Sequence, residues 1–175
     1  MSRKLIFYGA ISFDGYLARE DDSLDWFYGT EGEEEIGYAD FYSTIDTVLM
    51  GRRTYEQIVS ALSPNRFPYE GKACYVFSKS LLGRSEFVQF VGDDIVEFTR
   101  SLKAKRGQSI WVVGGGEALH PLIQARLVDE FIIQIAPAII GRGIPLFIPG
   151  NEDVRLRLLD VRRCGQFAEL HYEAQ

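Results

Sequence analysis

The sequence predicts an α/β fold built on a mixed, mostly parallel β-sheet, and three observations lead to this prediction. Residues 110–113 (IWVV) and 131–136 (FIIQIA) are nearly continuous apolar runs, which are typical of strands buried on both faces of a parallel sheet. Helical patterns separate the early strand-like segments, as right-handed βαβ crossovers require. The C-terminal end differs, because two strand patterns meet at residues 164–166 (CGQ) and predict an antiparallel hairpin.

The predicted elements alternate along most of the chain. Strand-like patterns cover residues 4–11, 47–50, 73–77, 87–90, 109–113, 131–136, 155–163 and 167–173. Helical patterns cover residues 34–44, 54–62, 93–105 and 119–125. In the last strand, Ala168, Leu170 and Tyr172 share one face. The acidic run at residues 29–35 (GTEGEEE) predicts a solvated loop before the first helix, where carboxylates suit the helix dipole.

Length and composition are those of an ordinary globular domain. The 175 residues are 46% hydrophobic and 25% charged, and no linker rich in Pro, Gly or Ser divides them, so we expect one domain over residues 1–175. No apolar run approaches the ~20 residues of a membrane span, and the N-terminus passes directly into a strand pattern, so we expect a cytoplasmic protein. The net charge of −6 disfavours a general nucleic-acid surface, which needs clustered Lys and Arg.

The two cysteines predict reduced structural thiols. Cys74 and Cys164 each lie within a strand-like segment, and neither has a neighbouring His or Cys at metal-ligand spacing. We therefore expect no metal site.

A glycine triplet at residues 114–116 lies between a buried strand and a helical pattern. Gly costs about 0.5–1 kcal/mol relative to Ala inside regular structure, so three in a row indicate positions where a side chain would be in the way. Such a turn directs backbone N–H groups at an anion, although the same glycines also suit a turn needed only for packing. The G-x-G-x-x-G fingerprint is absent, so a nucleotide bound here would belong to a fold other than Rossmann.

Two further strand ends offer anion-binding groups. Arg52 and Arg53 stand between a strand that ends at Gly51 and a predicted N-cap, Thr54. Their guanidinium groups match the oxygens of a phosphate. Alternatively, the two arginines are surface residues that offset the negative charge of the chain. Residues 78–80 (SKS) end another strand, where two hydroxyls and an ammonium suit a sugar phosphate or form an ordinary polar turn. Three such strand ends together favour an anion site at one edge of the sheet.

Two features are candidates for a substrate pocket. Trp26 lies in an aromatic cluster at residues 24–28 (LDWFY), whose rings either pack as core or lid or stack on a flat heterocycle. Gln134 is the polar exception within FIIQIA, and it either faces the pocket or satisfies a neighbouring backbone group.

Five motifs, in this order and at this spacing, resemble the dihydrofolate reductase superfamily. They are SFDGYLA (12–18), LMGRRTYE (49–56), VFSKS (76–80), VVGGGEAL (112–119) and LVDEFIIQIAPAIIGRGIPLF (127–147). They are most similar to the branch that includes the reductase (C-terminal) domain of the bifunctional riboflavin-biosynthesis deaminase/reductase. The resemblance covers nearly the whole chain. It implies a dihydrofolate reductase-like three-layer fold, with a mixed, mostly parallel eight-stranded sheet, flanking helices and a C-terminal antiparallel hairpin.

The resemblance also implies a cofactor and a reaction. The cofactor would be NADPH, and the hydride would pass to a small heterocyclic or carbonyl substrate, most like that of 5-amino-6-(5-phosphoribosylamino)uracil reductase or dihydrofolate reductase. A cis peptide within the glycines is frequent in the family. The matching cofactor positions are Ala10 and Leu17 beside the nicotinamide; Gly51, Arg52, Arg53 and Thr54 at the pyrophosphate and 2′-phosphate; Phe77, Ser78 and Lys79 at the adenosine end; and Gly114, Gly115, Gly116, Glu117 and Ala118 at the pyrophosphate.

The chain also departs from the family's pattern. In dihydrofolate reductases a carboxylate on the helix before the MGR motif holds the pterin, and counting back from Gly51 indicates Glu35 as the catalytic residue. Asp40, on the same predicted helix, is the competing candidate. Alternatively, both carboxylates face solvent. His120 and His171 are the only histidines and neither fits a deaminase zinc motif, so a stand-alone reductase-like domain is expected.

The residues leave other functions open. A non-catalytic NADP(H)-binding or sensor module is the main alternative, because no secure catalytic carboxylate is found, and an authentic folate enzyme is a third. Riboflavin-type relatives are commonly dimers, so a homodimer is expected. Its contact surface would be the apolar stretch at residues 135–150, which otherwise reads as a buried strand and loop.

Overall fold

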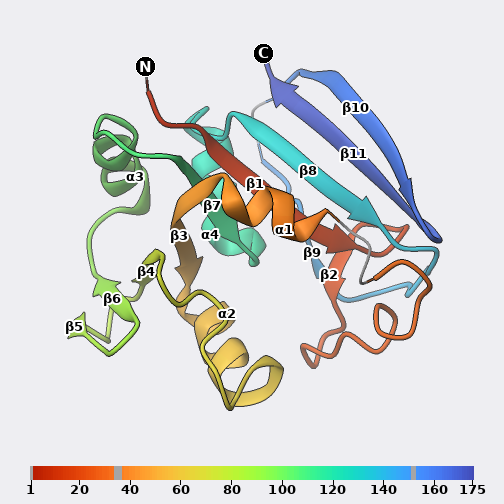
Figure 1. Cartoon of the computed structure of the whole chain (residues 1–175), viewed down its shortest axis with the longest axis horizontal. Helices are drawn as coiled ribbons and strands as arrows, with labels where there is room; N and C mark the ends of the chain where they lie inside the picture. Colours follow the sequence, from red (N-terminus) through yellow and green to blue (C-terminus); the bar gives the residue numbers. More distant parts are fainter. Residues whose placement is uncertain (1, 34–36, 151–152) are drawn as a thin grey trace.

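The computed structural model describes residues 2–33, 37–150 and 153–175, and a single sheet of nine strands runs through its centre (Figure 1). The strand order is β10-β11-β8-β1-β7-β3-β4-β6-β5. The nine strands are β1 (Leu5–Ile11), β3 (Ile45–Gly51), β4 (Ala73–Phe77), β5 (Gly83–Arg84), β6 (Val88–Val91), β7 (Ser109–Val113), β8 (Glu130–Ile135), β10 (Leu156–Cys164) and β11 (Phe167–Ala174).

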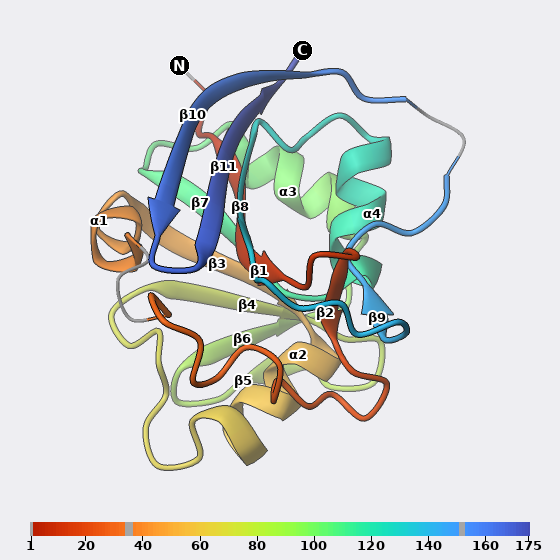
Figure 2. The ribbon, with the colours of Figure 1, turned by 90° about the vertical axis from the view of Figure 1, so that its right-hand side faces the viewer.

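The direction of the strands decides which ends meet. β8, β1, β7, β3, β4 and β6 pair in parallel, whereas the C-terminal hairpin of β10 and β11 adds to β8 in antiparallel fashion. A separate ribbon pairs β2 (Tyr16–Ala18) with β9 (Ile144–Pro145), and it lies beyond the end of β1 (Figure 2). The carboxyl ends of β1, β3, β4 and β7 therefore share one edge of the sheet.

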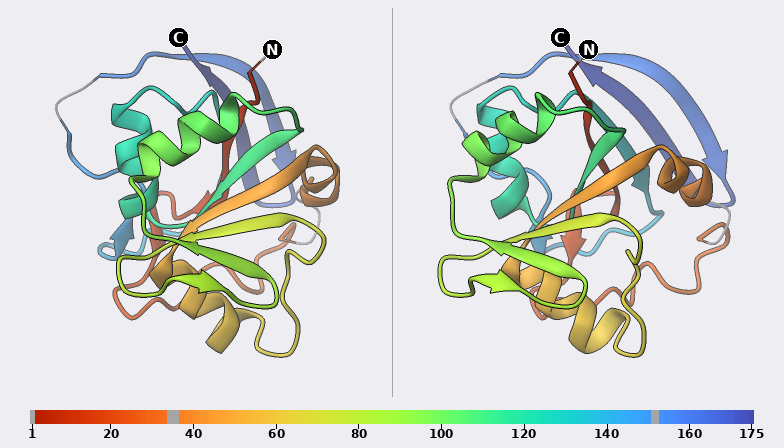
Figure 3. Two further views of the ribbon diagram at one scale, coloured as in Figure 1. Left: turned by 90° about the vertical axis from the view of Figure 1, so that its left-hand side faces the viewer. Right: turned by 60° about the vertical axis from the view of Figure 1, so that its left-hand side comes forward.

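Helices cover both faces of the sheet, giving three layers (Figure 3). On one face α3 (Ile95–Lys103) and α4 (Gly116–Gln124) bury leucines against Phe7 and Val112. On the other face α1 (Tyr38–Ser43), α2 (Arg52–Gln57) and its π-helical continuation η1 (Ile58–Leu62) pack over Tyr8 and Trp111. Asp94 caps α3, because its carboxylate accepts hydrogen bonds from the first-turn amides of that helix.

The structure confirms the predicted α/β class, with the eight predicted strands present. The ninth strand, β5, has two residues, and β2 and β9 have three and two, so none is long enough to produce a detectable alternation. Two helix starts were predicted wrongly. Thr54 is not an N-cap, because α2 begins at Arg52 behind Gly51, and α4 begins at Gly116 within the glycine triplet. No helix in the described ranges is long and apolar enough to cross a membrane.

Candidate functional site

A cavity of about 1080 Å³ lies at the edge of the sheet where β3, β4 and β7 end. Its volume is slightly above the range of about 300–1,000 Å³ that is usual for small-molecule and cofactor sites. Every predicted cofactor contact except Ala10 lines it. These residues are Leu17, Gly51, Arg52, Arg53, Thr54, Phe77, Ser78, Lys79, Gly114, Gly115, Gly116, Glu117 and Ala118. The fold thus brings the three anion-binding strand ends of the sequence to one wall, as the parallel pairing requires.

The glycine turn forms the floor of this cavity, and close packing explains its composition. Gly114 and Gly115 have positive φ values of 62° and 42°, and a Cβ on Gly114 would lie 2.9 Å from side-chain atoms of Thr54. A Cβ on Gly116 would lie 3.0 Å from the carbonyl oxygens of Pro145 and Leu146. The peptide bonds of the described residues are all trans, so the cis peptide frequent in the family is not found.

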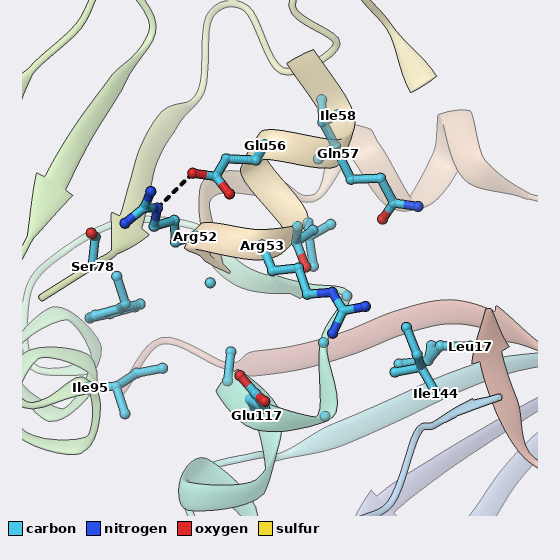
Figure 4. Close-up of a pocket in the computed structure, with 18 of the residues that line it drawn as sticks. Leu17, Arg52, Arg53, Glu56, Gln57, Ile58, Ser78, Ile95, Glu117 and Ile144 are labelled. Carbon is cyan, nitrogen blue, oxygen red and sulfur yellow. Dashed lines mark hydrogen bonds and ion pairs between the residues drawn. The ribbon is translucent and has the colours of Figure 1, made fainter. Parts of the chain in front are cut away.

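The same turn also starts α4, so both interpretations of the glycines apply. Gly115 occupies the N-cap position and provides no side-chain cap. The amides that precede Ala118 have no intrahelical acceptor, whereas those of Ala118 and Leu119 donate to the carbonyl of Gly115 at 3.1 Å, and the cavity lies against this turn. A diphosphate could therefore accept hydrogen bonds from these N–H groups at a favourable helix dipole. The carboxylate of Glu117 also lies at the cavity wall (Figure 4), so an anion would have to approach the backbone and not this side chain.

The two arginines face different parts of the cavity (Figure 4). Arg52 lies beside Ser78, donates from Nε to Glu56 Oε1 at 2.6 Å, and donates from a terminal nitrogen to the hydroxyl of Ser80. Arg53 forms an ion pair of 2.9 Å with Asp22, on the loop after β2. Arg52 therefore belongs to the β4 end of the cavity, and Arg53 joins α2 to the loop that follows β2.

Gln57 makes a second connection between α2 and that loop. Its Nε2 donates to the backbone oxygen of Asp22 at 2.7 Å. Asp22 has a positive φ of 67°, which is uncommon for a residue other than glycine. Sequence reasoning did not single out Asp22 or Gln57, and the only signal available was the turn-forming dipeptide Asp21-Asp22.

The strand end at β4 combines a structural serine with an exposed lysine. Ser78 is buried and its hydroxyl accepts hydrogen bonds from the amides of Leu81 at 2.9 Å and Ser80 at 3.3 Å, so it builds the turn itself. Lys79 is exposed and forms no ion pair with any residue that the structure describes. Together with Arg52, it gives this end of the cavity two cations on a chain of net charge −6.

The opposite end of the cavity is apolar. Leu17 and Ala18 of β2, Ile144 and Pro145 of β9, and Leu24 line it, and Leu17 and Ile144 lie together in Figure 4. Ala10 does not reach this wall. It lies on β1 in register with Gln134 of β8.

The substrate-side predictions are placed away from this cavity. Trp26 is 8% exposed and packs with Ala136 and Phe167, and it does not line the cavity. Gln134 neither faces the cavity nor pairs with backbone, since its Nε2 donates to Oε2 of Glu169 at 2.7 Å. Glu35 lies outside the described residues. Asp40 is exposed in the first turn of α1, so it does not provide a pocket carboxylate.

Glu169, on β11, was not found by sequence reasoning. Its side chain is 1% exposed, and its Oε1 lies 2.6 Å from a terminal nitrogen of the cross-strand residue Arg162. Arg162 thus forms an ion pair with the buried carboxylate, and Oε1 makes no hydrogen bond besides this ion pair. Burial, followed by the nearby Glu169 carboxylate, raises the pKa of Tyr8 well above its usual value. A buried carboxylate and a buried phenol thus lie close to each other on one face of the sheet.

The comparison with known families identifies the domain. Residues 3–168 match the model of the RibD C-terminal domain. The chain belongs to the RibD C-terminal domain family. It is therefore related to the reductase part of riboflavin-biosynthesis proteins, and the resemblance seen in the sequence is confirmed.

Individual relatives extend this result. The chain is 44% identical over 173 residues to an uncharacterized protein of Bacillus subtilis (strain 168), YwjB, with 98% of each covered. A putative riboflavin biosynthesis protein from Shewanella sp. PV-4 has a TM-score of 0.86 at 23% identity, covering 100% of this chain and 99% of the other.

A bifunctional relative shows the same fold in a longer chain. The Thermotoga maritima diaminohydroxyphosphoribosylaminopyrimidine deaminase/5-amino-6-(5-phosphoribosylamino)uracil reductase has a TM-score of 0.71 at 13% identity. The match covers 99% of this chain and 57% of that one. At this identity the likeness shows the dihydrofolate reductase-like fold of the RibD C-terminal domain.

Proposed function

We propose that this protein is an NADPH-dependent reductase that transfers a hydride to a small heterocyclic or carbonyl substrate. The observation that carries the proposal is the single wall on which the α4 N-terminus, Arg52 and Lys79 gather beside an apolar end. NADPH needs one anion site for its diphosphate, a second for its 2′-phosphate, and an apolar surface that excludes water from its nicotinamide. This wall offers all three. The family membership supports the same function.

The residues of the cavity fit the parts of NADPH in order. The amides of Gly115 to Glu117 at the start of α4 would hold the diphosphate, and the absence of side chains at Gly114 and Gly116 lets this turn pack closely on its neighbours. Arg52 and Lys79 would hold the 2′-phosphate, with Phe77 beside the adenosine. Leu17 and Ile144 would border the nicotinamide.

The chain's own contribution would be orientation and exclusion of water. Bound NADPH supplies the hydride. The apolar end formed by β2 and β9 keeps water from the reacting carbon, and the tether from Arg53 and Gln57 to Asp22 holds the neighbouring loop in place. The most similar reaction is that of 5-amino-6-(5-phosphoribosylamino)uracil reductase, named in the Thermotoga maritima relative, or of dihydrofolate reductase.

We propose further that the protein acts in the cytoplasm as a homodimer, with the outer face of the hairpin as the contact surface. Leu158 and Val161 of the edge strand β10 are 49% and 55% exposed. Phe147, 52% exposed, packs on Phe131, which lies in the same row of the sheet as Leu158. An exposed apolar edge of this kind favours association between copies.

The dimer is tested by sedimentation. The double variant Leu158→Asp with Val161→Asp should sediment as a monomer. Leu82→Asp, at a 72% exposed leucine outside the hairpin, is the matched control and should keep the mass of the wild type. A wild-type protein that is monomeric at all concentrations would contradict the proposal.

The reductase function is tested in two steps. Calorimetric titration with NADPH should show binding, and incubation of the complex with pterins, pyrimidine ribosides and small carbonyl compounds should then consume NADPH absorbance with one of them. Binding without oxidation on any substrate would indicate the non-catalytic NADP(H)-binding module instead. No binding of NADPH would remove both functions.

A further inference from the structure

An apolar part of the cavity lies beside the proposed cofactor sites and belongs to none of them. Its lining residues are Leu24 on the loop after β2, Ile58 and Leu62 of η1, and Tyr69 on the loop that follows η1. Ile58 and Tyr69 are buried and belong to the same core cluster, so this lining is a fixed part of the fold. We call these four residues the apolar arm of the cavity.

The apolar arm adjoins the end of the cavity proposed for the nicotinamide. Leu24 lines that end together with Leu17. Ile58 directly follows Gln57, whose side chain donates to the backbone oxygen of Asp22 at 2.7 Å and so joins the start of η1 to the same loop. The cavity is also slightly larger than is usual for one ligand. A substrate therefore has room in the apolar arm, beside the ring that would supply the hydride.

The charges around the apolar arm leave no cation for a substrate. Among the residues that the structure describes, the cations that line the cavity are Arg52, Arg53 and Lys79, and two of these lie at the β4 end. Arg53 extends from α2 toward the side on which the nicotinamide end lies (Figure 4), but it is held in an ion pair of 2.9 Å with Asp22. An anionic group placed here would lose its hydration without gaining a partner, and the carboxylates of Asp22 and Glu117 would repel it.

The backbone fixes the carboxylate that pairs with Arg53. Asp22 has a φ of 67°, a conformation that Asp and Asn adopt more readily than most other residues. The hydrogen bond from Gln57 to its backbone oxygen holds this turn against α2. The carboxylate is thus positioned from both sides, and neutralisation of Arg53 is built into the loop.

We infer that Asp22 is a specificity-determining residue: by pairing with Arg53 it restricts the site to uncharged substrates whose apolar part lies in the apolar arm. Substrates with a phosphate or carboxylate group at this position are excluded. The inference rests on the proposed reductase function, because it names the class of compound that would accept the hydride. The reaction would be of the same kind as that of the reductase named in the Thermotoga maritima relative, but with a substrate that lacks a phosphoribosyl group.

The probe pair is acetophenone and 4-acetylbenzoate, which share a ring and a ketone but differ in one carboxylate. Each is titrated into the wild-type protein with and without NADPH, and binding is followed by ligand-observed NMR. Acetophenone should bind at least about tenfold more tightly than 4-acetylbenzoate, as expected when a charged group is left unpaired in an apolar site.

The variant Asp22→Asn should create the missing anion site. Asparagine keeps the size of the side chain and the positive φ, but it frees Arg53 from its ion pair. Binding of 4-acetylbenzoate should tighten about threefold to tenfold, and that of acetophenone should stay unchanged. The double variant Asp22→Asn with Arg53→Gln should lose this gain. Asp25→Asn is the matched control, because it removes the same charge from the same loop at a residue that pairs with Arg19 and does not line the cavity.

Several results would overturn the inference. They are equal binding of the two probes to the wild type, no binding of acetophenone, no gain for 4-acetylbenzoate in Asp22→Asn, or the same gain in Asp25→Asn. NADPH binding, measured in the same samples, separates this failure from that of the reductase function. A protein that prefers acetophenone but binds no NADPH contradicts the reductase function alone, whereas one that binds NADPH and prefers the anion contradicts the inference alone.

Discussion

Replacing Arg52 with alanine should remove the preference for NADPH over NADH. A charge-assisted hydrogen bond from a guanidinium to a phosphate contributes about 1.5–3 kcal/mol. The Arg52 side chain is 46% exposed, so solvent screening places its contribution at about 1.5 kcal/mol. This corresponds to about a tenfold loss of NADPH affinity. NADH lacks the 2′-phosphate, and its affinity should stay close to that of the wild type.

Arg53→Ala is the matched control for this variant. Arg53 is already paired with Asp22 across the cavity mouth, and this exposed pair contributes about 0–1 kcal/mol. Its removal loosens the loop after β2, which affects both cofactors alike. We therefore expect NADPH and NADH to lose affinity by a similar, smaller factor. The contrast separates a residue that contacts the 2′-phosphate from one that holds a loop.

The assay is a calorimetric titration of each variant with both cofactors at low and high salt. The ratio of the NADH to the NADPH dissociation constant should fall about tenfold in Arg52→Ala and stay unchanged in Arg53→Ala. The wild-type preference for NADPH should shrink as salt rises. If Arg52→Ala weakens the binding of both cofactors by the same factor, the 2′-phosphate does not lie at the end of β4. The cofactor would then bind in another orientation.

Three other variants test the remaining contacts. Gly114→Ala should lower the free energy of unfolding by about 1–3 kcal/mol, because it combines a positive φ with a contact of 2.9 Å to the threonine side chain of α2; an unchanged denaturant midpoint would contradict this. Glu117→Gln should tighten NADPH binding about fivefold in calorimetry, since it removes a negative charge beside the diphosphate; weaker binding would show that the carboxylate itself is a ligand. Burial opposes ionisation of Glu130, yet hydrogen bonds from Lys4 and His171 outweigh it and hold the pKa of this carboxyl below its usual value. Its stabilisation is thus present above the usual pKa of about 4.5 and is lost as pH falls through the lower folded-state pKa, so Glu130→Gln should flatten the acid decline of the melting temperature.

The cofactor side of the fold could be predicted from sequence because its signals are local. Apolar runs such as IWVV identify strands by composition alone, since both faces are buried. Once the strands are known to be parallel, their carboxyl ends must share an edge, and Arg52, Ser78 and the glycine triplet follow each strand directly. Their convergence in one cavity then requires no knowledge of distances.

The errors in that region also have physical reasons. The start of α4 was predicted too late because glycine is a poor helix former and a triplet reads as a turn. The N–H of the first helical residue makes no intrahelical bond, however, so Gly116 begins the helix at little cost. Gly51 likewise precedes α2 without a capping side chain, and the helix begins before Thr54.

The substrate side could not be predicted, because the C-terminal hairpin reverses the usual pattern. Alternation in β11 places Ala168 and Leu170 on one face, and the rule for a half-buried strand sends that apolar face inward. In the structure Glu169 is buried and Ala168 is exposed, while Val161, the cross-strand neighbour of Leu170, is 55% exposed. A strand turned polar side inward is unfavourable unless both sides are compensated. On the inward face, Gln134 and Arg162 compensate the buried carboxylate of Glu169. On the outward face, a second copy of the chain would cover the exposed Leu158 and Val161. The double variant Leu158→Asp with Val161→Asp should therefore dissociate the dimer and leave the Gln134–Glu169 hydrogen bond on the opposite face of the hairpin intact.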